Sequence, residues 1–203
     1  VYQDGAFLPE QQTLGLYGDD VFTDYINTFI DSNRNNNFFV YYAPTAVHSP
    51  FGPTPDDPEF ATWDPKAKIS DVRFFPSMVR HLDWNIGRII SKLKETGLYN
   101  NTIVAVTGDN GTPKEIVSLF NGALFQGGKG STKEAGVHVP LFITWPNYIA
   151  PGTVNGNLVD FPDFMNTFAE MTATDISSFG QTDGVSFYRQ LTNELYTPRS
   201  YSY

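Results

Sequence analysis

The residues best suited to chemistry lie between positions 103 and 140. An apolar, β-branched run at residues 102–107 ends at a glycine and is followed by Asp109 and Asn110. Such a run predicts a strand that is buried on both faces. In open α/β sheets, ligands bind where the chain leaves the carboxyl ends of the strands. Adjacent carboxylate and amide oxygens at that point favour Ca²⁺ or Mg²⁺ over Zn²⁺.

Lys129 stands in a glycine-rich segment, residues 127–136. Glycines there let the backbone and one ammonium group approach an anion closely. A phosphate-binding P-loop is excluded, because Ala123 stands where the first glycine is required and Gly130 stands where Ser or Thr is required. Taken alone, however, Asp-Asn-Gly is a common β-turn and a lysine in such a loop is commonly solvated. The functional interpretation therefore depends on the elements around both segments.

Helices and strands are predicted to alternate along the chain, which is typical of an α/β sheet. Short apolar runs predict strands, and apolar residues at helical spacing predict helices. The predicted strands are residues 38–43, 102–107 and 140–145. The first predicted helix follows Asp19 and Asp20, which can cap it. The second spans about residues 71–98 with Gly97 as the stop, and the third covers residues 163–171. His81 and Asp83 on the second helix are expected to be structural.

His48 follows the predicted strand at residues 38–43, in a loop whose prolines exclude a helix. We expect it to emerge at the same sheet edge as Asp109 and Asn110. Aromatic residues follow in this loop; they could stack on a sugar, although packing within the loop is the commoner role. These aromatic residues are Phe51, Phe60 and Trp63.

Composition limits the classes of function. The 203 residues, 40% of them hydrophobic, suffice for one sizeable core. Thirteen basic against 22 acidic residues give a net charge of -9, which argues against binding to nucleic acid or to an anionic membrane. Absence of cysteine excludes disulfides and a thiolate nucleophile. No apolar run approaches the length of a membrane span, and Val1 does not begin a signal peptide.

Four segments in a fixed order resemble the sulfatase family of the alkaline phosphatase superfamily. They are FFVYYAPTAVHSP, NNTIVAVTGDNG, GGKGSTKEAGVHVPLFITWP, and LVDFPDFMNTFAEMT with TDGVSFYRQL after it. The resemblance implies an alkaline-phosphatase-like α/β fold, with a mixed, mostly parallel sheet flanked by helices. It also implies a sulfuric ester hydrolase that acts on a sulfated small molecule or carbohydrate, and a periplasmic or secreted location.

The resemblance also implies roles for individual residues. His48 matches the histidine that contacts the substrate sulfate near the leaving oxygen, and Lys129 matches the lysine that binds sulfate oxygens. Asp109 and Asn110 match two ligands of a divalent cation, Ca²⁺ rather than Mg²⁺. His138 stands where many members carry an arginine, and its role stays open.

Family sulfatases use a formylglycine made from Cys or Ser in a Cys/Ser-x-Pro-x-Arg motif, which this sequence lacks. The paired aspartates of the family's N-terminal half are also missing. We therefore expect residues 1–203 to form the later part of a catalytic domain, incomplete on its N-terminal side. Residues 1–18 are expected to be irregular and residues 172–203 to form a turn-rich tail.

Three consequences follow from that expectation. The chain alone should be inactive, and an exposed sheet edge should favour self-association. A phosphonate or phosphodiester hydrolase of the same superfamily is an alternative that the retained residues do not separate well. A non-catalytic remnant that binds a glycan or a partner chain is another, and the net charge of -9 argues against broad polyanion binding.

Overall fold

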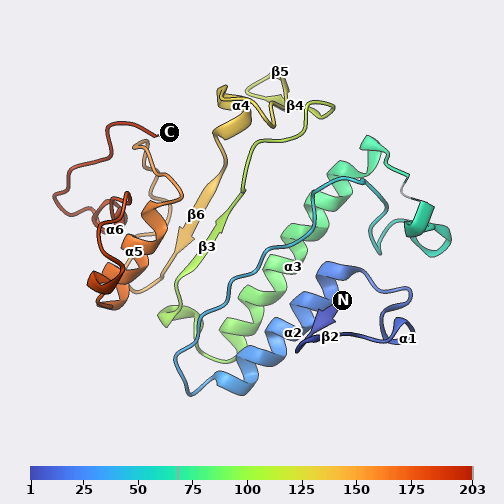
Figure 1. Ribbon diagram of the computed structural model, residues 1–203, viewed down its shortest axis with the longest axis horizontal. Helices are drawn as coiled ribbons and strands as arrows, with labels where there is room; N and C mark the ends of the chain where they lie inside the picture. Colours follow the sequence, from blue (N-terminus) through green and yellow to red (C-terminus); the bar gives the residue numbers. More distant parts are fainter. Residues whose placement is uncertain (68, 203) are drawn as a thin grey trace. The chain divides into compact units, whose positions relative to one another are not determined.

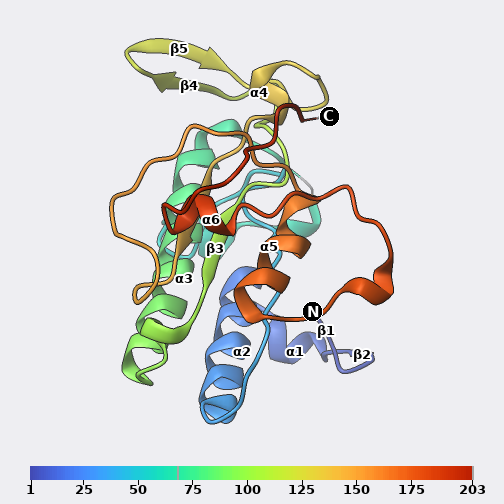
Figure 2. The same cartoon turned by 90° about the vertical axis from the view of Figure 1, so that its left-hand side faces the viewer.

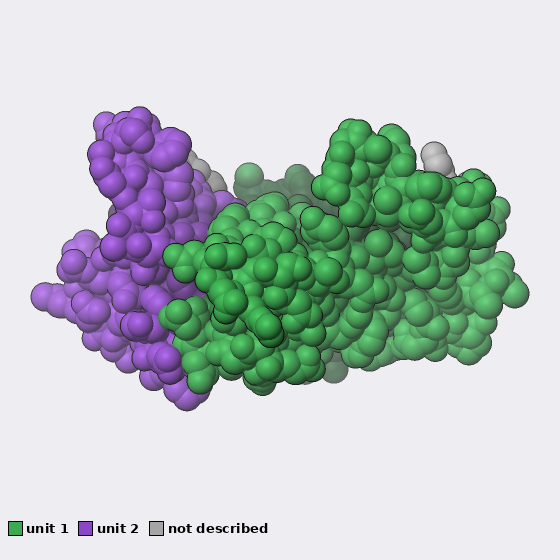
Figure 3. Space-filling view, turned by 90° about the horizontal axis from the view of Figure 1, so that it is seen from below, with its two compact units in different colours: residues 1–102, 106–142 green, residues 103–105, 143–203 purple. Residues whose placement is uncertain are grey.

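A computed structural model describes residues 1–67 and 69–202, which form two compact units (Figures 1 and 3). Unit 1 comprises residues 1–102 and 106–142, and unit 2 comprises residues 103–105 and 143–203. All four residues that are predicted to do chemistry belong to unit 1. The candidate site can therefore be built within one unit.

Both units contain short helices and short strands. The α-helices are α1 (Glu10–Thr13), α2 (Gly18–Asn33), α3 (Phe75–Glu95), α4 (Glu134–Val137), α5 (Asp163–Thr172) and α6 (Tyr188–Leu191). The 3-10 helices are η1 (Phe60–Thr62), η2 (Pro65–Ala67), η3 (Val72–Phe74), η4 (Tyr99–Asn101) and η5 (Ser177–Phe179). The strands are β1 (Tyr2–Gln3), β2 (Ala6–Phe7), β3 (Val104–Thr107), β4 (Val117–Phe120), β5 (Ala123–Gln126) and β6 (Leu141–Thr144).

Helices α2 and α3 form the frame of unit 1 and lie side by side (Figures 1 and 2). Both were predicted from apolar periodicity, and the structure confirms them. Pro76 lies in the first turn of α3, where its missing N–H costs no helical hydrogen bond. Gly97 ends the helix with a φ of 76°, a left-handed conformation that glycine adopts without steric cost.

Polar side chains also join the two helices. Asp20 accepts hydrogen bonds from His81 Nε2 at 2.7 Å and from Asn85 Nδ2 at 2.8 Å. His81 is only 7% exposed, and its ring packs edge-on against Tyr17. The predicted structural role of His81 agrees with this position.

The core of unit 1 joins segments that are far apart in the sequence. Its buried members are Ala46, Phe51, Phe74, Met78 and Ile116. Trp63 packs against Phe74 with ring centroids 5.3 Å apart, and Phe60 lies near Tyr17. The aromatic residues after His48 thus pack within the unit, as the commoner of the two predicted roles requires. Ile116 brings the segment after Asp109 onto the same core as the loop that carries His48.

The sheets are small. Strands β1 and β2 pair antiparallel, as do β4 and β5, and β3 pairs with β6. β3 and β6 confirm two of the predicted strands, but burial of β3 on both faces was wrong, because Ala105 and Thr107 are exposed. The mostly parallel sheet stays a prediction.

The predicted strand at residues 38–43 was also wrong, since this segment has no strand assignment. Its side chains are not buried either: Phe39 is 75% exposed and Tyr41 is 85% exposed. A strand requires a neighbour to receive its backbone hydrogen bonds. No segment within residues 1–67 and 69–202 pairs with residues 38–43 as a strand.

The two ends of the chain contain more structure than was expected. Residues 1–18 include the β1–β2 pair and the one-turn helix α1, and the tail includes η5 and α6. In unit 2 the predicted helix near residue 163 is α5, and its Phe164 packs edge-on against Phe187. Among the described residues, no helix combines the length and the apolarity needed to cross a membrane.

Candidate functional site

The turn after β3 presents two oxygen-bearing side chains. β3 ends at Thr107, and the chain then passes through Gly108 to Asp109 and Asn110. Asp109 is exposed and Asn110 is partly buried, whereas the next residue, Gly111, is buried. The side chains that could bind a ligand thus sit directly beside a packed backbone.

Backbone hydrogen bonds join this turn to the loop that carries Lys129. Gly111 N–H donates to the Gly136 carbonyl at 2.9 Å, and Lys129 N–H donates to the Thr112 carbonyl at 3.0 Å. Gly127 N–H donates to the Ile116 carbonyl at 2.9 Å. The structure therefore brings Asp109, Asn110 and Lys129 together on two loops that share backbone bonds.

Close backbone approach explains why this region is rich in glycine. A Cβ atom on Gly111 would lie 2.0 Å from the Ala135 carbonyl oxygen. A Cβ on Gly127 would lie 2.1 Å from the Pro113 oxygen, and one on Gly136 would lie 2.2 Å from the Ser131 oxygen. Real Cβ atoms do not approach that closely, so these positions admit only glycine unless the backbone moves.

The chemically active side chains of the two loops are free. Within the part of the chain that the structure describes, Asp109, Asn110 and Lys129 make no side-chain hydrogen bond or ion pair. Asp109 and Asn110 fit a hard cation by chemistry, since each offers an oxygen. Ca²⁺ takes about six to eight oxygens. No group of three or more acidic or histidine side chains among the described residues is arranged to hold a metal. These two residues would thus supply part of a cation site.

His48 lies on a separate loop of the same unit and is exposed. Its Nδ1 is 2.7 Å from the carbonyl oxygen of Ser49. Because a carbonyl oxygen only accepts hydrogen bonds, Nδ1 carries a proton. Nε2 is then available to another group. The loop is joined to the Lys129 region through the shared core, in which Ala46 and Ile116 both pack.

A small cavity of about 100 Å³ lies beside the turn at residues 109–111. Asn110, Ser118, Phe125 and His138 contribute to its lining. His138 Nδ1 is 3.1 Å from Glu134 Oε1, and both side chains are exposed. His138 therefore borders the same cavity as Asn110.

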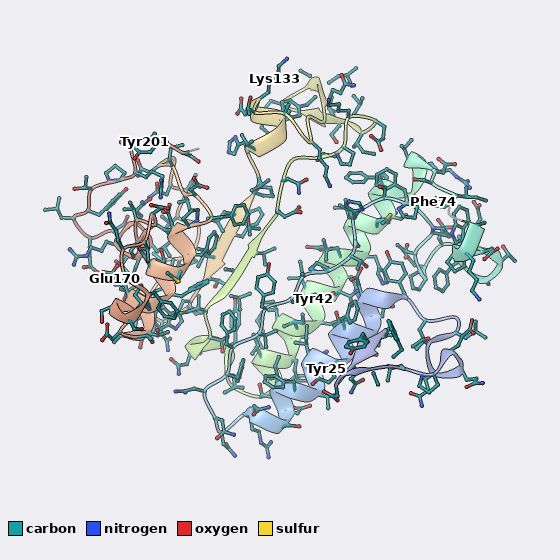
Figure 4. All side chains as sticks on the ribbon, in the orientation of Figure 1. Tyr25, Tyr42, Phe74, Lys133, Glu170 and Tyr201 are labelled. Carbon is teal, nitrogen blue, oxygen red and sulfur yellow. The ribbon has the colours of Figure 1, made fainter. Side chains whose placement is uncertain are left out.

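Sequence reasoning missed the β4–β5 hairpin, which supplies Ser118 and Phe125 to this cavity. The hairpin projects from the rest of unit 1 next to α4 (Figure 2). Its turn residues, Asn121 and Gly122, have φ values of 50° and 79°. An Asn-Gly pair between apolar runs is a strong hairpin signal, so the sequence did contain it. Figure 4 labels Lys133, which directly precedes α4.

Two half-buried tyrosines of unit 1, Tyr17 and Tyr42, have raised pKa values. Burial raises the pKa of Tyr42 to about 12. Burial, together with the charges of Asp19 and Asp20, also raises the pKa of Tyr17. Figure 4 shows Tyr42 beside α2 and α3. Both phenols therefore stay neutral at physiological pH, and Tyr42 donates a hydrogen bond to the Asp19 carbonyl at 3.4 Å.

Comparisons with known proteins agree on one family. The family model described as Sulfatase matches residues 2–174. An N-acetylgalactosamine-6-O-sulfatase of Bacteroides thetaiotaomicron is 28% identical over 90% of this chain and 36% of its own length. The steryl-sulfatase of Mus musculus is 30% identical over 77% of this chain and 24% of its own length.

A solved structure agrees as well. The crystal structure of Ps i-CgsB in complex with k-i-k-neocarrahexaose matches with a TM-score of 0.71 and 26% identity. The match covers 88% of this chain and 39% of the chain in that structure. The chain thus spans between 24% and 39% of the length of these relatives. The matches support the α/β fold of alkaline phosphatase type that the sequence predicts, and the chain belongs to the sulfatase family.

Proposed function

We propose that this chain supplies part of the active site of a sulfuric ester hydrolase. In this proposal Asp109 and Asn110 are ligands of Ca²⁺, and Lys129 and His48 bind the sulfate group. One observation carries the proposal: the side chains of Asp109, Asn110 and Lys129 have no partner among the described residues, although backbone hydrogen bonds from Gly111 and Lys129 hold the two loops together. Family membership supplies the substrate class, a sulfate ester.

The chemistry of these groups suits the transfer of a sulfuryl group. When bound, Ca²⁺ would supply positive charge beside the sulfate oxygens. The Lys129 ammonium would neutralise charge on the same group and hold it in place. His48 Nδ1 donates to the Ser49 carbonyl, so Nε2 can donate toward the leaving oxygen when the ring is doubly protonated, as an imidazolium.

The nucleophile that family sulfatases use has no counterpart in this sequence. This sequence has no Cys or Ser in a Cys/Ser-x-Pro-x-Arg motif that could become formylglycine. We therefore propose that the chain alone does not hydrolyse sulfate esters. The test is an aryl sulfate assay with and without Ca²⁺, and turnover above the buffer rate would overturn this proposal.

A sulfated carbohydrate is the substrate that we propose. The relative from Bacteroides thetaiotaomicron is named for a sulfated amino sugar, and one matching structure holds an oligosaccharide. The steryl-sulfatase match shows that the family also includes proteins named for other substrates. Competition between a sulfated and an unsulfated oligosaccharide for binding to the chain tests this, and equal binding of the two would contradict it.

Family membership also suggests where the protein is located. We propose a periplasmic or secreted protein, in line with the habit of the family.

We also propose self-association through the exposed apolar residues near 38–43, because Phe39 and Tyr41 face solvent. Size-exclusion chromatography with light scattering would show this as a mass that rises with concentration. A constant monomer mass would contradict it.

Calcium titration is the direct test of the site. Isothermal titration should give a dissociation constant on the order of 1 mM for Ca²⁺, since only part of the ligand set is present. Asp109→Asn should abolish the heat signal, and Mg²⁺ should bind more weakly. Asp24→Asn is the control, because Asp24 is an exposed residue of α2 paired with Arg88. Unchanged Ca²⁺ binding by Asp109→Asn would overturn the assignment.

A further inference from the structure

Asp19 is a buried carboxylate whose hydrogen bonds leave its own helix. It is 1% exposed and lies in the first turn of α2, and that helix has no side-chain cap at its N-terminus. Asp19 Oδ1 accepts from Thr45 N–H at 2.8 Å, and Oδ2 accepts from Ala46 N–H at 2.9 Å. The Thr45 hydroxyl also lies within 3.3 Å of both oxygens. The carboxylate thus fixes two consecutive peptide groups.

Those two peptide groups belong to the turn that presents His48. His48 N–H donates to the Thr45 carbonyl at 2.9 Å, which closes the turn. On its other side the turn is packed into the core, since Ala46 is buried and Val47 packs against the same cluster. The backbone before His48 is therefore held by a carboxylate on one side and by apolar contacts on the other.

The two hydrogen bonds from Thr45 and Ala46 to the Asp19 carboxylate should be strong. Hydrogen bonds to an ionised acceptor are about twice as strong as neutral ones, and exclusion of water strengthens them further. Asp19 forms no ion pair with any described residue. Its charge is stabilised by these amides and the Thr45 hydroxyl, so the turn and the carboxylate require each other.

We propose that Asp19 is the positioning residue that orients His48 toward the sulfate ester. This proposal rests on the proposed function, in which His48 contacts the sulfate. Asp19 does not touch the substrate and acts only through the turn at residues 45–48. Asparagine at this position would keep one acceptor oxygen but place an NH₂ group against one of the two N–H donors.

The experiment uses the three histidines of the chain, His48, His81 and His138, as separate probes. Their imidazole signals in ¹H–¹³C spectra are assigned with three His→Gln variants. Sodium sulfate is titrated at a fixed pH of about 6.5, with sodium chloride at matched ionic strength as the blank. In the wild type, the His48 signal should move and that of the buried His81 should not.

Asp19→Asn should weaken the apparent affinity for sulfate, measured from the His48 signal, about tenfold, because a small misplacement of a site residue has a large effect on how well the site functions. It should also speed hydrogen exchange at the Ala46 amide. The matched control is Asp163→Asn in unit 2. Asp163 is equally buried at 1% exposed and also accepts two backbone N–H groups, from Asp160 and Val185. This control should leave the His48 response unchanged.

A second variant covers the case in which Asp19→Asn does not fold. Thr45→Val keeps the two backbone bonds and removes the hydroxyl, so it should weaken the His48 response about twofold to threefold. Circular dichroism shows which variants are folded.

The outcomes separate the two proposals. If sulfate does not move His48 in the wild type, the role of His48 in the proposed function fails, and the role of Asp19 fails with it. If sulfate moves His48 equally in the wild type and in every folded variant, only the role of Asp19 fails.

Discussion

Asp19 and Asp109 have the same side chain in opposite surroundings. Asp19 is buried, and its two oxygens accept bonds from Thr45 and Ala46. Asp109 is exposed and has no side-chain partner among the described residues. The backbone that flanks Asp109 is nevertheless held by hydrogen bonds such as that from Gly111 to Gly136. The difference teaches how to separate the two roles: a saturated carboxylate supports structure, and a free one on a fixed backbone is ready for a ligand.

The same contrast extends to neighbouring groups. Asp20 is another saturated carboxylate, bonded to His81 and Asn85, whereas Asn110 and Lys129 are free like Asp109. Removal of a partner from a saturated group leaves a buried polar atom unsatisfied, which is costly. Removal of a free group leaves no buried polar atom without a partner. Substitutions should therefore affect stability in one region and ligand binding in the other.

Arg199→Ala should have the largest effect on stability. Arg199 pairs with Asp163, and both side chains are buried. Loss of one partner from a buried pair costs about 3–5 kcal/mol. Urea denaturation monitored by circular dichroism measures it. Arg189→Ala is the control, because its pair with Glu170 is more exposed and should contribute less than about 1 kcal/mol. Equal losses would show that burial of the Arg199–Asp163 pair does not set its contribution to stability.

The same pair predicts a dependence on pH. Burial alone would raise the pKa of Asp163, but hydrogen bonds from Arg199, Val185 and Asp160 outweigh it and lower the pKa. A lowered folded-state pKa contributes stability above the unfolded value of about 3.9, and this contribution is lost as the pH falls through the folded value. Arg199→Ala removes the largest cause that lowers this pKa, so its free energy of unfolding should fall less than that of the wild type as the pH drops below about 3.9, and the difference between the two proteins should narrow.

Gly111→Ala should have the next largest effect and would break the fixed backbone under the free side chains. Its Cβ would lie 2.0 Å from a carbonyl oxygen, so overpacking should cost about 1–3 kcal/mol and also weaken Ca²⁺ binding. Gly87→Ala in α3 is the matched control, since nothing lies within 4 Å of its Cβ. That change should stabilise the helix by about 0.5–1 kcal/mol. Normal Ca²⁺ binding by Gly111→Ala would show that the backbone bonds are not needed.

A comparison of Asp19→Asn with Asp109→Asn tests the contrast directly. Asp19→Asn should lower the free energy of unfolding by about 1–3 kcal/mol, because it leaves a buried donor unsatisfied. Asp109→Asn should change it by less than about 0.5 kcal/mol, as is usual for exposed positions. Parallel denaturation curves give both values. A large loss with Asp109→Asn would mean that this residue supports the fold.

Lys129→Met should have the smallest effect on stability. The side chain makes no bond to a described residue, so the free energy of unfolding should stay within about 0.5 kcal/mol of the wild type. The response of the histidine signals to sulfate should nevertheless be lost. Retention of that response would show that Lys129 does not bind the anion.

Sequence reasoning predicted part of this molecule well. Helices α2, α3 and α5 were predictable because apolar residues recur at helical spacing over many residues, and Gly97 marks the end of α3. The glycine-rich loop around Lys129 was predicted to allow close approach of the backbone, and Gly127 and Gly136 do lie against other backbone atoms. The roles assigned to these residues are still predictions.

Other features could not be read from local patterns. The run FFVYYA has a strand pattern, but a strand exists only where a neighbour accepts its hydrogen bonds, and that neighbour is not local information. Asp19 was predicted as a helix cap, yet its carboxylate bonds a turn 26 residues away. The β4–β5 hairpin is the exception, since Asn121 and Gly122 signalled it in the sequence.

The interleaved glycines have a consequence for the history of such a site. Gly111, Gly127 and Gly136 fix the course of two loops without help from the side chains they display. A change at Asp109, Asn110 or Lys129 should therefore leave the scaffold in place. Under the proposed function, the ligands of the site could change by single replacements at these three positions, while the glycines beneath them have almost no freedom to vary.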